Sequence, residues 1–212
     1  YVFQSPSQML FARTVREEIG LAPEDRPLAA YVSRLALQKG ADLLAEAMGA
    51  IAETGCQIAV LGQGDRSLEE RVREAARRLA PRAAARIGFD EGLAHRLIAA
   101  ADLLLIPSRF EPCGMTQMYA MRYGTIPVAR RVGGLADTIR DLDADPHEGT
   151  GVLFDGEDAA SLADAVRSAL RALSDTGRRD AITRRGMSSD FSWSRSAVGY
   201  ATVYSRAIAE SG

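Results

Sequence analysis

The sequence has few of the residues that mark specialised classes of protein. Its 212 residues include two cysteines, two histidines and one tryptophan, and aromatic residues make up only 6%. Two cysteines are too few for a disulfide framework, and with the two histidines they show no metal-ligand spacing. We therefore expect a protein of a reducing compartment, the cytoplasm, with no bound metal.

Long apolar runs and an excess of one charge are also lacking. No run approaches the roughly 20 apolar residues of a membrane-spanning helix, and no basic-then-apolar segment opens the chain, so we expect neither a membrane span nor a signal peptide. The 26 basic and 28 acidic residues give a net charge of −2 and are interspersed. This argues against nucleic acid as the main partner, because phosphate neutralisation needs clustered basic residues.

Lysine is almost absent, since Lys39 is the only lysine among the basic residues. Lysine and arginine differ in size, donor geometry and hydration, so this position is a candidate for a site that needs a compact ammonium. The alternative is chance survival of one lysine in a sequence whose coding composition favours arginine.

Short, continuous apolar runs bounded by turn residues predict the strands. They span residues 28–35, 57–61, 85–89, 103–107, 126–128 and 152–154. Continuous rather than alternating apolar runs are typical of strands that are covered on both faces. Segments with helical spacing lie between them, which predicts an α/β fold with a doubly wound, mainly parallel, Rossmann-like sheet.

One domain accounts for this pattern. We expect a linker-like leading segment at 1–26, a Rossmann-like ligand-binding domain at 27–190 and a C-terminal helix at 191–212. Because the chain opens at Tyr1 without an initiator methionine, we also expect it to be the second half of a longer protein.

Ligands of open parallel sheets bind beyond the carboxyl ends of the strands, so the residues there are examined first. Arg34 and Lys39 follow the first predicted strand, five residues apart, in a loop that opens a helix. An arginine fork, a lysine point charge and the amides of a helix terminus can together bind a diphosphate. The alternative is a pair of exposed surface cations.

The next two strand ends carry glycines. Gly62 and Gly64 suggest a dinucleotide-binding loop, but they follow the second strand, and Ser67 stands where a third small residue is needed. We interpret them as a tight turn with close backbone approach. Gly88 and Phe89 after the third strand offer an open backbone and a stacking ring to a flat ligand, although Phe89 alone also suits a core.

The fourth strand is followed by the segment with the most unusual residues, 107–119. Here Glu111 can accept hydrogen bonds from hydroxyls, while the loop through Gly114 presents backbone N–H groups and a helix N-terminus to anions. Cys113 is either a nucleophile or, as we expect without a histidine nearby in sequence, a small residue in a tight loop. A further glycine pair, Gly133 and Gly134, follows the fifth strand. Five such strand ends predict a cleft for a ligand with phosphates and hydroxyls.

Four sequence segments carry a resemblance to a known family. Residues 33–40, 107–114, 123–131 and 133–138 resemble the C-terminal half of bacterial glycogen synthases and plant starch synthases, and the likeness extends over about residues 20–208. The resemblance implies a GT-B glycosyltransferase, built from two Rossmann-like domains. This chain would then be the domain that holds the nucleotide sugar.

The resemblance also implies roles by position. Arg34 and Lys39 would bind the donor diphosphate, and Glu111 would hold the glucosyl hydroxyls. The other implied donor contacts are the amides of Cys113, Gly114 and Met115, a phosphate contact by Thr116, an adenine site at Gly88 and Phe89, and a ribose contact by Tyr119. Two positions depart from relatives. Phe89 replaces a common tyrosine, and Tyr119 stands where the wider retaining group has a second glutamate.

The implied reaction transfers glucose from ADP-glucose to the non-reducing end of an α-1,4-glucan with retention and without a metal or cofactor. An N-terminal domain would complete the site, so we expect the isolated chain to be inactive. One alternative is a GT-B enzyme that uses another nucleotide sugar such as UDP-glucose. Another is a non-catalytic nucleotide-binding module.

Overall fold

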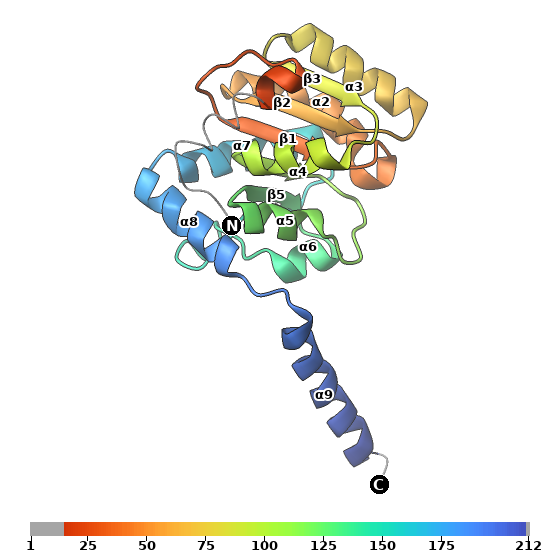
Figure 1. Cartoon of the computed structure of the whole chain (residues 1–212), viewed down its shortest axis with the longest axis vertical. Coiled ribbons are helices and arrows are strands. Elements are labelled where there is room, and N and C mark those ends of the chain that lie inside the picture. The colour runs from red at the N-terminus through yellow and green to blue at the C-terminus, as the bar shows by residue number, and fades with distance from the viewer. Residues whose placement is uncertain (1–14, 211–212) are drawn as a thin grey trace.

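The computed structural model of the chain describes residues 15–210, and these form one six-stranded parallel sheet with helices around it (Figure 1). The strand order is β3-β2-β1-β4-β5-β6, and all five neighbouring pairs are parallel. The strands are β1 (Leu28–Val32), β2 (Gln57–Gly62), β3 (Ala83–Ile87), β4 (Leu103–Ile106), β5 (Ile126–Arg130) and β6 (Val152–Phe154).

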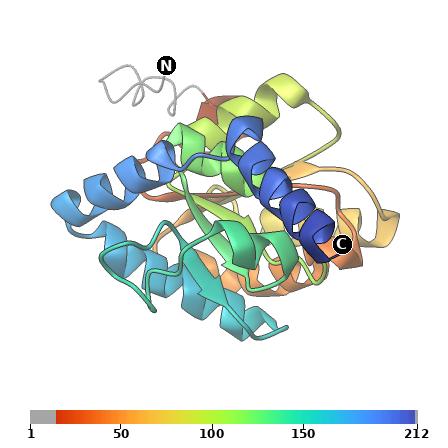
Figure 2. The ribbon, with the colours of Figure 1, turned by 90° about the horizontal axis from the view of Figure 1, so that it is seen from below.

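Helices cover both faces of this sheet, as the view in Figure 2 shows. One face packs against α2 (Ala41–Glu53), α3 (Arg66–Leu79) and α7 (Ala159–Leu173). The other packs against α4 (Glu91–Ala100), α5 (Thr116–Tyr123) and α6 (Gly133–Thr138). The remaining elements are a 3-10 turn η1 (Leu37–Lys39), α8 (Thr176–Ser188) and α9 (Trp193–Glu210).

The two apolar layers explain why the strand segments are continuously apolar. Along β1, Leu28 and Ala30 belong to the layer under α4 and α5, whereas Ala29 and Tyr31 belong to the layer under α2 and α7. All four are at most 1% exposed. Side chains alternate between faces along a strand, and both faces here are buried, so no position is left for a polar residue. The predicted doubly wound, Rossmann-like fold is confirmed.

Strand ends differ from the prediction by a few residues. β1 ends at Val32 rather than at the predicted Leu35. β3 ends at Ile87 rather than at the predicted Phe89, because Gly88 adopts a positive φ of 152°. The close backbone approach expected after β2 is present. A Cβ on Gly62 would lie 1.9 Å from the carbonyl oxygen of Ser33, so only glycine fits there.

Both ends of the chain bear on the predicted domain limits, which remain predictions. Of the leading segment 1–26, residues 1–14 lie outside the described residues, while 15–19 are helical and Val15 and Ile19 are buried in the layer beside α4. At the other end, α9 projects from the body, and each of its residues is exposed (Figure 1). No helix within 15–210 has the length and apolar character that crossing a membrane requires.

The strand order places the point where the winding reverses between β1 and β4. At such a switch point the two connecting loops leave in opposite directions and open a crevice at the carboxyl ends of the strands. Here the flanking loops are residues 33–40 after β1 and 107–115 after β4, which are the two segments that carry Lys39 and Glu111.

Candidate functional site

Lys39 and Glu111 meet across the switch point. The Lys39 Nζ lies 2.5 Å from Glu111 Oε2, and their side chains are only 17% and 10% exposed. The buried Ser108 hydroxyl also donates to Oε2, at 3.2 Å. In the described part of the chain, Glu111 Oε1 accepts no hydrogen bond. The site therefore combines a partly buried ammonium, able to bind an anion, with a carboxylate oxygen that is free to accept a bond from a hydroxyl.

The loop that carries Arg34 and Lys39 is anchored beneath by a tyrosine. The Tyr31 hydroxyl lies 3.0 Å from the Arg34 carbonyl oxygen and 3.3 Å from that of Lys39. Burial raises the pKa of this phenol, so it stays protonated and able to donate. The Arg34 side chain is exposed and forms no ion pair within the described residues. Arg34 thus supplies an uncommitted positive charge to the same loop as Lys39.

The N-terminus of α5 offers unpaired backbone donors beside Glu111. Among residues 15–210, the N–H groups of Cys113, Gly114 and Met115 make no hydrogen bond, and no side chain caps the helix. The fully buried Gln117 binds the carbonyl oxygens of Cys113 and Gly114 through Nε2, both at 3.1 Å. Unpaired amides and the positive end of the helix dipole are a suitable site for an anion or a hydroxyl-rich ligand.

A glycine pair at the start of α6 holds the Glu111 loop in place. The Gly134 N–H donates to the Glu111 carbonyl at 2.9 Å. A Cβ on Gly133 would lie 2.2 Å from that same oxygen, and one on Gly134 would lie 2.1 Å from the Cys113 carbonyl. Side chains at either position would push this loop away, which explains the paired glycines in the sequence.

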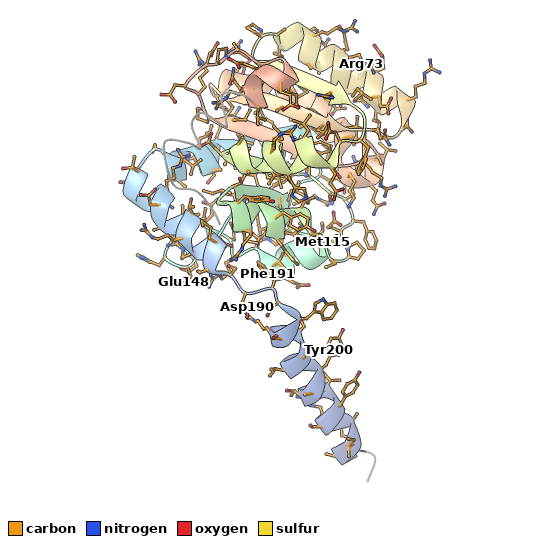
Figure 3. All side chains as sticks on the ribbon, in the orientation of Figure 1. Arg73, Met115, Glu148, Asp190, Phe191 and Tyr200 are labelled. Atoms are coloured by element: carbon orange, nitrogen blue, oxygen red, sulfur yellow. The ribbon has the colours of Figure 1, made fainter. Side chains whose placement is uncertain are left out.

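The remaining predicted contacts line the same edge of the sheet farther from the switch point. Gly88, with open space around its Cα, and the 80% exposed Phe89 follow β3, two strands from β1. At about 4.8 Å per strand this is roughly 10 Å from the Lys39 loop. Met115 is 62% exposed at the surface (Figure 3), and Tyr119 is 40% exposed, its ring 5.4 Å from that of His95.

The structure therefore joins the side chain of Lys39 directly to that of Glu111 and places the other predicted residues along the same edge of the sheet. Sequence reasoning missed Ser108, Gln117 and Arg109, which hold this machinery in place. All three lie inside the quoted segment 107–119, so their position in that segment was the only available signal. Arg109 is paired with Asp42, 67 residues away, and nothing local in the sequence indicates that contact.

The two cysteines differ sharply in environment. Cys113 is exposed beside Glu111, and Cys56 is fully buried, where desolvation raises its pKa to about 11. No histidine contacts Cys113 in the described residues, so we retain its interpretation as a small loop residue. Within 15–210 no cluster of three or more histidine, cysteine or acidic residues is arranged to hold a metal ion.

Comparisons with known proteins show the family to which the chain belongs. The sequence profile of the family described as "Glycosyl transferases group 1" matches residues 13–186. A glycogen synthase of Anaeromyxobacter sp. (strain Fw109-5) is 52% identical over 192 residues, and one of Rhodospirillum rubrum is 46% identical over 201 residues. The chain is covered to 90% and 94%, yet it spans only 40% and 41% of these relatives.

A solved structure gives the same result. The catalytic domain of starch synthase IV from Arabidopsis thaliana, bound to ADP and acarbose, superposes with a TM-score of 0.85 at 33% identity, over 96% of this chain and 43% of that one. The resemblance stated from the sequence is thus confirmed. So is the prediction of a Rossmann-like fold that forms part of a longer GT-B architecture.

Proposed function

Because this chain belongs to the glycosyl transferases group 1 family, we propose that it is the donor-binding part of a glucosyltransferase that extends an α-1,4-glucan from ADP-glucose. The glycogen and starch synthases to which it is similar support the glucan product. The ADP in the starch synthase IV structure supports an adenine nucleotide. The chain spans about 40% of its curated relatives, so a further domain is proposed to complete the site for catalysis.

The observation that carries this proposal is the contact between Lys39 and Glu111 at the switch point. In the proposed complex, Lys39 and Arg34 bind the diphosphate together with the Thr116 hydroxyl. Glu111 and the amides of residues 113–115 bind the sugar hydroxyls. Without a ligand, the Lys39 ammonium and the Glu111 carboxylate neutralise each other. A ligand with both phosphates and hydroxyls offers the ammonium an anion and the carboxylate a hydrogen-bond donor.

The other predicted contacts extend the proposed site toward β3. Phe89 is proposed to stack on adenine beside Gly88, where no side chain blocks the backbone. Tyr119 is proposed to contact the ribose from the first turn of α5. The exposure of both rings leaves their faces free for a ligand.

Chemically, the bond between the anomeric carbon and the diphosphate oxygen breaks, and a bond from an acceptor hydroxyl oxygen to that carbon forms on the same face. The bond electrons leave with ADP, and the acceptor's proton is released. Lys39 and Arg34 stabilise the negative charge that grows on the diphosphate, and this favours the transition state over the bound donor. Retention is an implication of the family resemblance.

The test is calorimetric titration of the 212-residue chain with ADP-glucose, UDP-glucose and ADP. The variant is Lys39→Ala, and the matched control is Arg73→Ala, which removes one positive charge from α3, far from the site (Figure 3). We expect adenine-nucleotide binding that is lost in Lys39→Ala and kept in Arg73→Ala.

Two results would contradict the proposal. Preference for UDP-glucose would favour the alternative donor. Absence of binding to this chain and to a full-length protein that contains it would instead favour a module without donor-binding function.

A further inference from the structure

Arg109 connects the two loops that carry Lys39 and Glu111. It lies two residues before Glu111, and its guanidinium reaches across to the start of α2. Nη1 and Nη2 bind the two carboxylate oxygens of Asp42 at 2.7 and 2.8 Å, and Nη1 also donates to the Leu37 carbonyl at 2.7 Å. Leu37 lies two residues before Lys39, and Asp42 lies three residues after it. The guanidinium thus holds the Lys39 loop from both ends.

This ion pair is partly shielded from water. The side chains of Arg109 and Asp42 are 26% and 14% exposed. The fork geometry is bidentate, the arrangement that adds most directional specificity to an arginine–carboxylate pair. Hydrogen bonding to the guanidinium lowers the pKa of Asp42 and raises that of Arg109, so both are charged at neutral pH. The pair therefore fixes the relative position of the two side chains, in addition to the attraction between their charges.

The loop between β6 and α7 also contacts the Arg109 guanidinium. Arg109 Nε binds Glu157 Oε1 at 2.8 Å, and Arg130 binds the other oxygen of Glu157 at 3.0 Å. Glu157 lies between β6 and α7, and Arg130 ends β5. The guanidinium thus joins segments that follow β1, β4 and β6. Its nitrogen atoms are committed to the protein, which leaves Arg109 poorly suited to bind a substrate phosphate itself.

Backbone contacts fix the same two loops in one register. The Arg109 N–H donates to the Gln38 carbonyl at 2.8 Å, and the Gln38 side chain donates to the Phe110 carbonyl at 3.3 Å. Gly40 lies so close that a Cβ there would be 2.0 Å from the Pro107 oxygen. A shift of either loop would have to break these contacts together.

We propose that Arg109 is a positioning residue that holds Lys39 opposite Glu111 through its pair with Asp42, so that both meet the donor in one geometry. The expected effect on ADP-glucose binding rests on the proposed function. The expected effect on the positions of the two loops does not. Residues in one network of hydrogen bonds and ion pairs are energetically coupled, so loosening the loops should weaken donor binding by about tenfold.

The experiment compares Arg109→Gln with the control Arg131→Gln in the 212-residue chain. Arg131 also binds two carboxylates, Asp141 at 2.6 Å and Asp155 at 3.0 Å, but it lies outside the proposed site. Amide hydrogen exchange without ligand is expected to speed up in Arg109→Gln only, at the hydrogen-bonded N–H groups of Ala36, Lys39, Gly40 and residue 109. Unchanged exchange in these loops would overturn the positioning role whether or not the chain binds a nucleotide.

Calorimetry with ADP-glucose then tests the consequence for the donor. Arg109→Gln is expected to bind about tenfold more weakly, Arg109→Lys to recover part of the loss, and Arg131→Gln to match wild type. If the wild-type chain binds ADP-glucose and Arg109→Gln binds it with the same affinity, the inference is overturned. If the wild-type chain binds no ADP-glucose, hydrogen exchange alone decides the positioning role.

If Arg109→Gln fails to fold, Arg109→Lys and Asp42→Asn replace it in both measurements. Each keeps the approximate shape of the side chain but breaks the bidentate pair. Faster exchange in both loops of these variants supports the proposal, and exchange equal to wild type overturns it.

Discussion

At the scale of single residues, the only lysine of an arginine-rich chain is the residue whose ammonium reaches Glu111. Its side chain is 17% exposed, and its nitrogen lies 2.5 Å from the carboxylate. A guanidinium is larger and planar and places its donors in a fork, so it does not reproduce a point contact in this confined loop. The structure thus gives a physical reason for a lysine at position 39.

Lys39→Arg is therefore expected to weaken ADP-glucose binding although it conserves the charge. The loss should be about 1.5–3 kcal/mol, the usual contribution of a hydrogen bond to a charged group. Calorimetry measures it, with Arg73→Lys as the converse exchange at an exposed position. Equal affinity of wild type and Lys39→Arg would show that charge alone matters at position 39.

Glu111→Ala should separate the nucleotide from the sugar. The proposed contact of Glu111 is with glucosyl hydroxyls, and its removal also frees Lys39 from the ion pair. We expect ADP affinity to be kept or increased and ADP-glucose affinity to fall, by about 1–3 kcal/mol for a lost charged hydrogen bond. Competitive titration of the two ligands measures the difference. An equal loss for both would contradict the assignment to the sugar.

The two thiols should differ in reactivity. Cys113 is exposed, whereas Cys56 is fully buried with a pKa raised to about 11. The thiolate is the reactive form, so at pH 8 a disulfide reagent should label one thiol per folded chain quickly and the second only after unfolding. Cys113→Ser should abolish the fast phase, whereas a persistent fast phase would place the reactive thiol at Cys56.

At the scale of elements, the site depends on loops that approach each other more closely than side chains allow. Gly134, at the start of α6, lies against the carbonyl of Cys113 in the loop before α5. Gly40 lies equally close to Pro107, so the loop after β1 also rests on backbone contact. These glycines set the distances between elements, and the side chains of the site rely on them.

Gly134→Ala is expected to displace the Glu111 loop, because its new Cβ would lie 2.1 Å from the Cys113 oxygen. Overpacking of this kind costs about 1–3 kcal/mol, and thermal unfolding and donor titration should both record a loss. Gly49→Ala is the control. It lies inside α2 with nothing within 4 Å, and alanine there should stabilise the chain by about 0.5–1 kcal/mol. Donor affinity equal to wild type in Gly134→Ala would contradict this account of the glycine pair.

At the scale of the whole molecule, the folded core and α9 are separate in this chain. Both apolar layers of the sheet are completed by residues 15–21 and by α2 to α8, whereas the large apolar side chains of α9 are exposed, as Tyr200 illustrates in Figure 3. Trp193, the only tryptophan, lies at the start of α9 and is 82% exposed. The core therefore contains no tryptophan.

Because the core contains no tryptophan, we expect tryptophan fluorescence to change little when the core unfolds. The emission maximum of the 212-residue chain is expected to be that of a water-exposed indole both before and after denaturation, while circular dichroism follows a cooperative transition. Removal of residues 191–212 should leave the thermal midpoint unchanged within the error of the measurement. A blue-shifted emission, or a lower midpoint on truncation, would mean that α9 packs on the core.

Sequence patterns alone were enough to predict the fold class correctly, and they also predict which residues line the proposed site. Continuous apolar runs predict buried parallel strands because that signal is local, and five strand ends with unusual residues predict a cleft because parallel strands share one carboxyl edge. Tertiary structure alone decided which of these loops meet. The pair between Arg109 and Asp42 and the contact of Gly134 with the Glu111 loop both depend on segments far apart in the chain. Local sequence patterns record the preferences of a segment, and contacts of this kind exist only once the sheet has brought the segments together.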